Sequence, residues 1–174
     1  MRSNVRDLKC AAAACGLIVA LAVVGARIAH AAPPTVAVLD GLTGFRGQQF
    51  GAPPAAGMVL AETDGSLKFY HRPTDRLKLA KATLTEIIYG YYKDQFFVAI
   101  LKTKGKVNAH ALLDVFNDVY GTPTQPNAAL PRYAWSGKVN SASFVADPAY
   151  VNAKAAIVNN AIDAQHDADV AGQP

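Results

Sequence analysis

The chain has 174 residues, of which 51% are hydrophobic, and a formal net charge of +4. Both cysteines, Cys10 and Cys15, lie in the first 31 residues, so the remainder of the chain has neither disulfides nor thiol catalysis. From Ala32 onward, 13 Lys and Arg face 12 Asp and Glu, a net charge of +1 that gives no reason to expect nucleic acid as a partner.

Residues 1–31 have the layout of a secretory signal peptide. Residues 2–9 carry three basic side chains, residues 10–25 are apolar or small, and Ala29-His30-Ala31 is a small-x-small cleavage site. The apolar run is short for a bilayer span, and an uncleaved anchor is the alternative interpretation. We predict cleavage after Ala31 and a periplasmic or secreted protein without a transmembrane span.

The next segments are short and separated by glycine and proline. Residues 35–39 predict a short strand, and residues 45–51 (FRGQQFG) predict an aromatic, glycine-rich loop. Pro53-Pro54 favours a short helix over residues 55–61, because proline suits a first helical turn. Residues 67–72 predict another strand.

The strongest local signal is the stretch IIYGYYKDQFFVAIL, residues 87–101. Residues 83–92 and 96–103 are rich in β-branched and aromatic side chains, and the polar residues 93–95 between them have the length of a hairpin loop. Alternation predicts that Phe96, Val98 and Ile100 share one face of the second strand. Both faces are apolar in the middle. Either the hairpin is covered on each side or one face is left free to bind.

Residues 108–120 predict an amphipathic helix, with Asn108 as its cap and Gly121 after its end. Its apolar stripe can cover the hairpin. Residues 133–136 and 141–146 predict two further strands. The stripe consists of Ala109, Leu112, Leu113, Phe116, Val119 and Tyr120.

The C-terminal part has two interpretations. Residues 154–159 form either a last strand or part of a helix that begins at Asp147-Pro148. Residues 163–174 are polar and small, and we predict a frayed tail. Together these patterns predict a single α+β domain over residues 32–162. It contains an antiparallel sheet of about five or six strands with one main helix packed on a face.

Four motifs follow one another in this chain: FRG-x-x-x-G, Y-x-R-x-x-D-x-L, I-x-Y-G-x-Y-x-x-x-F-F and L-x-x-x-F-x-x-x-YG. Their order resembles a group of small bacterial secreted proteins without an assigned biochemical role. The resemblance implies a compact α+β domain, favours a strand over residues 154–159 and supplies no catalytic residues. Ala80-Lys81 departs from it, since a glycine is expected there. The matching residues are Phe45, Arg46, Gly47, Gly51, Tyr70, Arg72, Asp75, Leu77, Ile88, Gly90, Tyr92, Phe96, Phe97, Leu112, Phe116, Tyr120 and Gly121.

No motif predicts a catalytic residue, a metal site or a cofactor. His71, His110 and His166 lack the spacing of metal ligands, and no serine lies in a nucleophile motif. The acidic segment around His166 is more readily a solvated tail than a cation site, because no rigid element fixes its ligands.

Arginines and tyrosines supply the first candidate for ligand binding. We interpret Tyr70-x-Arg72-x-x-Asp75 as a structural turn clamp, since arginine pairs well with carboxylates. The functional alternative is that Arg46, Tyr70 and Arg72 converge on an anionic ligand. In the hairpin, whose aromatics mostly predict core, Tyr91 and Tyr92 are the ones expected to be exposed.

Lys102, Lys104 and Lys106 supply the second candidate, as a basic stripe on one strand face. The stripe could contact anionic lipid, lipopolysaccharide or peptidoglycan. Its alternative role is a charged strand end that discourages aggregation.

The sequence therefore predicts an exported, non-enzymatic cell-envelope protein. Its partner would be an unknown envelope protein or an anionic envelope ligand, bound through the sheet face or the FRG loop. The alternative is a periplasmic hydrolase-like enzyme with a dispersed active site. An enzyme needs titratable groups gathered in one cleft, whereas a binding module needs an accessible patch.

Overall fold

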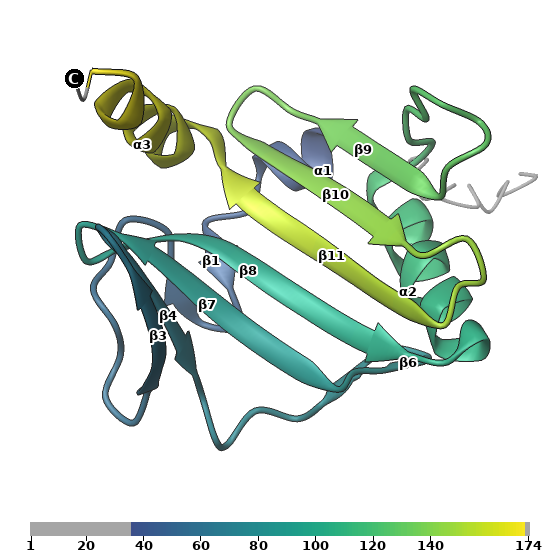
Figure 1. Ribbon diagram of the computed structural model, residues 1–174, viewed down its shortest axis with the longest axis horizontal. Helices are drawn as coiled ribbons and strands as arrows, with labels where there is room; N and C mark the ends of the chain where they lie inside the picture. The colour runs from purple at the N-terminus through teal and green to yellow at the C-terminus, as the bar shows by residue number, and fades with distance from the viewer. Residues whose placement is uncertain (1–35, 173–174) are drawn as a thin grey trace, which may run out of the picture. The chain divides into compact units, whose positions relative to one another are not determined.

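A seven-stranded antiparallel sheet dominates the computed structural model, which describes residues 36–172 (Figure 1). The predicted signal peptide and its cleavage site lie outside these residues. The strand order is β3-β4-β7-β8-β11-β10-β9, so the α+β class is confirmed, with more strands than the predicted five or six. The strands are β3 (Val59–Asp64), β4 (Leu67–His71), β7 (Glu86–Tyr92), β8 (Gln95–Lys104), β9 (Arg132–Ser136), β10 (Asn140–Ala146) and β11 (Asn152–Asn159).

Strands β7 and β8 form the predicted hairpin at the centre of the sheet. Lys93 and Asp94 make its turn with φ angles of 48° and 60°, the left-handed pair that two-residue hairpin turns require. The register shifts next to the turn, where Tyr91 pairs with Phe96 but Gly90 pairs with Val98. Such a bulge reverses the facing of the residues beyond it.

The bulge changes which residues of β8 share a face. Phe96 joins the main core with Ala99 and Leu101, while Val98 lies in a second cluster on the other face, against which Ile100 packs. The prediction that Phe96 shares a face with Val98 and Ile100 is therefore wrong. Simple alternation fails because one extra residue of β8 is inserted next to the turn.

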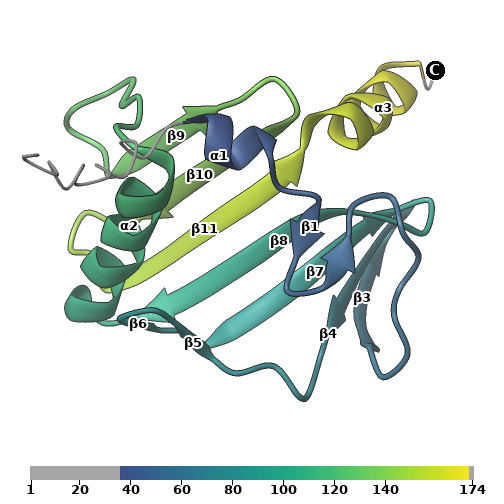
Figure 2. The ribbon, with the colours of Figure 1, turned by 180° about the vertical axis from the view of Figure 1, so that it is seen from behind.

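Helix α2 (Lys106–Tyr120) packs on the core face of the sheet, as Figure 2 shows. Its predicted stripe is buried except for Val119, which is 39% exposed. Gly105, with φ of 91°, is the N-cap residue, so Asn108 is not the cap. Asn108 lies in the first turn, where its side chain accepts from the backbone N–H of Thr83 at 3.2 Å. The buried positions of α2 are Ala109, Leu112, Leu113, Phe116 and Tyr120.

Two predictions for the N-terminal segments are wrong. Residues 35–39 were expected to form a strand, yet helix α1 (Val36–Asp40) begins there, because packing of the fully buried Leu39 outweighs local β-propensity. Residues 55–61 form a turn and the start of β3 in place of a helix, since Gly57 has a φ of 82°.

The remaining small elements are two short hairpins that flank the main sheet. The FRG segment forms β1 (Gly44–Phe45) and β2 (Gln48–Gln49), with Arg46 and Gly47 at the turn between them. Strands β5 (Lys78–Leu79) and β6 (Ala82–Thr83) form the second. Figure 2 shows both hairpins on the α2 side of the sheet.

The C-terminal part follows the strand interpretation, because β11 pairs with both β8 and β10. Asp147 does not start a helix. Its carboxylate accepts backbone N–H groups of Ala149, Val151 and Asn152 at 2.8–3.1 Å, which closes a tight loop before β11.

Residues 163–171 are helical, so the prediction of a frayed tail is wrong for them. They belong to α3 (Asn160–Ala171), which begins where the side chain of Asn159 accepts from the N–H of Ile162. Ile162 is 6% exposed and packs against Tyr92, Phe97 and Val98. In the part of the chain that the structure describes, no helix is long and apolar enough to cross a membrane.

The two edges of the main sheet differ. On β9, Ala134 exchanges backbone hydrogen bonds with Thr124 at 2.8 and 2.9 Å, so a short loop segment covers this edge. At the other edge every residue of β3 is exposed. The pairing of β3 with β4 is interrupted by a register shift between Leu60 and Glu62.

Candidate functional site

The side of the sheet that faces away from α2 carries the candidate site, and we call it the open face. Helix α3 packs at one end of this face, against β8 and β11, and the strands between that end and the opposite rim stand clear of any helix in residues 36–172 (Figure 1). On β8 the open face presents alternate residues, from Val98 near α3 to Lys104 at the far rim.

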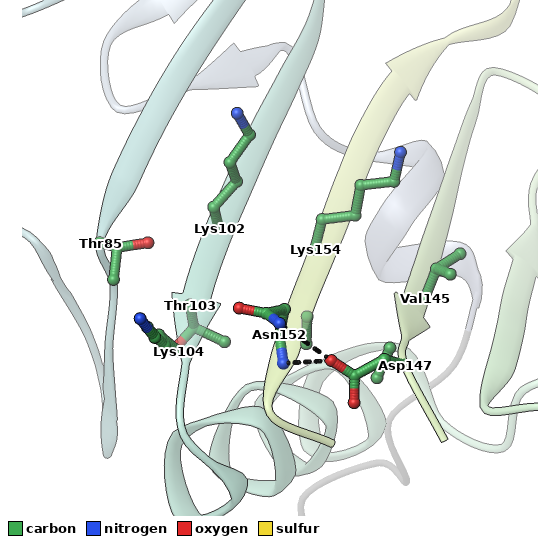
Figure 3. Close-up of a pocket in the computed structure, with 10 residues that line it drawn as sticks. Thr85, Lys102, Thr103, Lys104, Val145, Asp147, Asn152 and Lys154 are labelled. Atoms are coloured by element: carbon green, nitrogen blue, oxygen red, sulfur yellow. Dashed lines mark hydrogen bonds between the residues drawn. The ribbon is translucent and has the colours of Figure 1, made fainter. Parts of the chain in front are cut away.

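Two lysines lie directly opposite each other on this face. Lys102 of β8 pairs with Lys154 of β11, and Figure 3 shows both side chains extending in the same direction along the strands. Like charges placed opposite each other in a sheet are destabilising. A groove of about 540 Å³ surrounds the pair. Its lining residues are Thr85, Lys102, Thr103, Lys104, Val145, Ala146, Asp147, Asn152, Ala153 and Lys154.

One carboxylate offsets part of this charge. Glu86 lies 2.8 Å from Nζ of Lys102 and 3.4 Å from Nε2 of His71. Within residues 36–172, no carboxylate lies within 4.0 Å of the amino group of Lys104 or Lys154. These two exposed lysines leave the groove with an excess of positive charge.

Asp147 lies at the rim of the groove and adds a negative charge there, but within residues 36–172 its carboxylate is more than 4.0 Å from every lysine amino group. Its oxygens accept the backbone N–H groups of Val151 and Asn152, and these bonds lower the pKa of the carboxyl below its usual value. The side chain of Asn152 also donates to it at 3.0 Å (Figure 3). The acceptor positions of Asp147 are thus used to hold the loop before β11.

An apolar strip adjoins the lysine pair on the open face. The next two cross-strand pairs are Ile100 with Ala156 and Val98 with Val158. A second hollow, of about 290 Å³, lies over the Ile100 end of this strip and shares Lys102 and Lys154 with the groove. Its lining residues are Ala61, Glu62, Phe69, His71, Glu86, Ile88, Ile100, Lys102 and Lys154.

The predicted arginines, Arg46 and Arg72, lie close together, but their guanidinium groups already bind backbone oxygens and a carboxylate of the same chain. Arg46 donates to the backbone oxygens of Arg76 and Lys78 at 2.5 and 2.7 Å, and Arg72 donates to that of Arg46 at 2.9 Å. Asp75, whose side chain is 8% exposed, lies 3.7 Å from Arg72 and 4.0 Å from Arg46. This geometry supports the structural clamp over an anion-binding site.

Tyr89 is the third residue that contacts the carboxylate of Asp75. Its hydroxyl donates to Asp75 at 2.6 Å, and the guanidinium carbon of Arg72 lies 4.9 Å from its ring centroid. Burial, together with the bond to Asp75, raises the pKa of Tyr89 well above its usual value. The hydroxyl therefore stays protonated and remains a donor to the carboxylate.

The predicted tyrosines contribute to packing. Tyr91 is fully buried, its hydroxyl donates to Sδ of Met58 at 3.0 Å, and the ring of Tyr70 meets it edge-on at 5.1 Å. Tyr92 is 2% exposed, and its hydroxyl donates to Asp169 of α3. The expectation that Tyr91 and Tyr92 are exposed is wrong, because other segments cover both rings.

The basic stripe is present in a different form from the one predicted. Lys102 and Lys104 share the open face, but Lys106 begins α2 and does not continue the strand. Lys154, which sequence reasoning missed, takes its place from the neighbouring strand. The alternation of Lys154 with Ala156 and Val158 was a visible signal for a strand with one partly apolar face. Its pairing with β8 was not visible in the local sequence.

The histidines do not assemble a catalytic group among the described residues. His71 meets Glu86, the ring of His110 stacks on Tyr150 at 4.4 Å, and His166 meets the ring of Tyr92 edge-on at 5.1 Å. Within residues 36–172 no serine hydroxyl is hydrogen-bonded to any of them. The same residues contain no group of three or more His, Cys, Asp or Glu that could hold a metal ion.

Comparisons of the chain with protein-family models, with curated proteins and with solved structures found no match. The α+β fold alone does not define a function, because unrelated activities share such folds. The site must therefore be interpreted from its own chemistry, which is a cationic groove beside an apolar strip.

Proposed function

We propose that this chain is an exported, non-enzymatic cell-envelope protein that binds an anionic partner through the open face of its sheet. The observation that carries the proposal is the pairing of Lys102 with Lys154. Like charges opposite each other cost stability; Glu86 offsets the charge of Lys102, but Lys154 has no carboxylate of residues 36–172 within 4.0 Å. An anion bound between the two amino groups would remove the repulsion and gain two charge-assisted hydrogen bonds.

The open face is a better candidate than the FRG loop. Arg46, the cation of that loop, already donates to two backbone oxygens and lies beside Asp75. The amino groups of Lys104 and Lys154 are exposed and border a groove large enough for a small ligand. Export is supported by the basic, apolar and small-x-small order of residues 1–31.

The enzymatic alternative has less support. A hydrolase needs a nucleophile or an activated water next to a base. His71, which lies on the open face, contacts Glu86 and the backbone oxygen of Ile87. A binding role requires only the charge and shape that the face already presents.

A titration with pyrophosphate tests the proposal. Backbone amide signals of the exported protein, followed by NMR, should shift at β8 and β11. Lys154→Gln should weaken binding about tenfold, the loss expected for one charge-assisted contact on an accessible surface. Lys81→Gln is the matched control, because Lys81 is equally a surface lysine but pairs with Asp114 of α2. Equal affinity of the Lys154→Gln variant and the control would refute the proposal.

A further inference from the structure

Charge and apolarity are separated along the open face. Starting from the Lys102–Lys154 pair and moving along the two strands towards α3, the next pairs are Ile100 with Ala156 and Val98 with Val158. All six residues share one face, because residues two apart in a strand point the same way. By backbone position the face is cationic in one row and apolar in the following two, and the lysine side chains extend along the strands towards the apolar rows (Figure 3).

The apolar strip is wider than two strands. Ile88 of β7 pairs with Ile100, and the ring of Phe69 on β4 lies over Gly90. A Cβ at Gly90 would come within 3.2 Å of that ring and 2.4 Å of Val98, so glycine allows this close approach. The resulting hollow of about 290 Å³ is lined by the apolar side chains of Ala61, Phe69, Ile88 and Ile100 together with Glu62, His71, Glu86 and the two lysines.

The strip is also bounded at its far end. Ile162 of α3 packs there against Tyr92, Phe97 and Val98. Ile88, Ile100, Ala156 and Val158 are each partly exposed, so they have surface left for further contacts. Val98 is only 7% exposed beneath Ile162, but Val158 beside it is partly exposed, so the strip continues along β11. From Lys154 to Val158 it spans about 13 Å at a rise of ~3.3 Å per residue, which suits an apolar chain of limited length.

We propose that the open face binds a single anionic amphiphile, a molecule with one phosphate-like or carboxylate-like head and an apolar tail. This inference rests on the proposed function and deepens it. The head lies between the amino groups of Lys102 and Lys154, and the tail lies along the apolar strip towards α3. Recognition of both parts by adjoining surfaces would account for two lysines that face each other next to apolar side chains.

Two other anionic partners fit the surface less well. A long polyanion needs cationic side chains along the whole groove, but here Glu86 and Glu62 lie among them at the second hollow. A membrane surface needs apolar side chains that protrude. Ile88 and Ile100 lie in a hollow beside the lysines, so a single molecule suits the strip better than a bilayer.

Alkyl phosphates of increasing length test the inference, with the full exported protein and monomeric ligand concentrations. By calorimetry, octyl phosphate should bind at least tenfold more tightly than methyl phosphate, because each methylene that the strip buries adds about two- to fourfold in affinity. Lys102→Gln and Lys154→Gln should weaken both ligands. Ile100→Thr should weaken octyl phosphate and leave methyl phosphate and pyrophosphate unchanged.

A second variant of the strip keeps the test valid if Ile100→Thr fails to fold. Ala156→Leu keeps the strip apolar but fills it, so it should reduce the gain from chain length while the thermal unfolding midpoint stays close to that of the parent protein. Equal affinity for methyl and octyl phosphate, with loss of both in the lysine variants, would refute the proposed binding of an apolar tail. It would still support an anion site at the two lysines. Binding of anionic phosphatidylglycerol vesicles without binding of monomeric octyl phosphate would also overturn it. If pyrophosphate and every alkyl phosphate fail to bind, the proposed function itself is wrong.

Discussion

Replacement of Asp75 by alanine should destabilise the protein by about 3–4 kcal/mol. Asp75 is 8% exposed and lies beside two arginines while it accepts the hydroxyl of Tyr89 at 2.6 Å. Removing one partner from a buried ion pair costs about 3–5 kcal/mol of folding stability. Leaving the buried hydroxyl of Tyr89 without its acceptor costs about 1–3 kcal/mol more. We expect a value at or just below the lower end of the summed range, because Arg46 and Arg72 are 22% and 20% exposed and water can solvate part of their charge.

Urea unfolding followed by the fluorescence of Trp135, the single tryptophan, measures this cost. The loss corresponds to a fall of roughly 10 °C in the thermal midpoint for a domain of this size. Tyr89→Phe is the matched control: it removes the hydroxyl but keeps the carboxylate and both arginines, and should cost only about 1 kcal/mol. If Asp75→Ala costs no more than Tyr89→Phe, the ion cluster is not a clamp and the reasoning fails.

Three further predictions concern other parts of the fold. Gly90→Ala should lower the free energy of unfolding by about 1–3 kcal/mol, since the new Cβ would lie 2.4 Å from Val98; unchanged urea unfolding would contradict this. Backbone N–H groups of the β9–β10 turn lower the pKa of Asp40, so its contribution to stability is present above pH ~4 and lost as pH falls through the lower folded value. The difference in thermal midpoint between the parent protein and Asp40→Asn should therefore shrink from pH 6 to pH 2, and a constant difference would count against this linkage. Asp169→Asn, which weakens the contact with Lys93, should speed amide exchange in α3 but not in β8, and equal exchange in α3 would show that this contact does not hold the helix.

The central hairpin and α2 could be predicted because their signals are local. Aromatic and β-branched runs on either side of Lys93-Asp94 specify two paired strands, and the spacing of Leu112 and Phe116 specifies a buried helical face. Tertiary packing decided the rest. The burial of Leu39 favours a helix where the local sequence predicts a strand, and the bulge beside Gly90 turns the side chain of Phe96 to the opposite face of the sheet.

The candidate site was only half accessible to sequence reasoning. The alternation in β8 places Lys102 and Lys104 on one face, and this part follows from the period of a strand. The partner Lys154 comes from a segment about fifty residues further along the chain, and only the β8–β11 register places it opposite Lys102. The arginines were grouped correctly, but their donors are satisfied by backbone oxygens whose positions the sequence does not reveal.

The unequal edges of the main sheet have a consequence for samples at high concentration. Thr124 already occupies the hydrogen-bonding groups of Ala134 on β9. In contrast, β3 is the last strand of the sheet and all of its residues are exposed, Val59 and Leu60 included. Any filament or ribbon of stacked molecules would therefore nucleate at β3. A lysine placed at Leu60 should delay the onset of turbidity on prolonged storage.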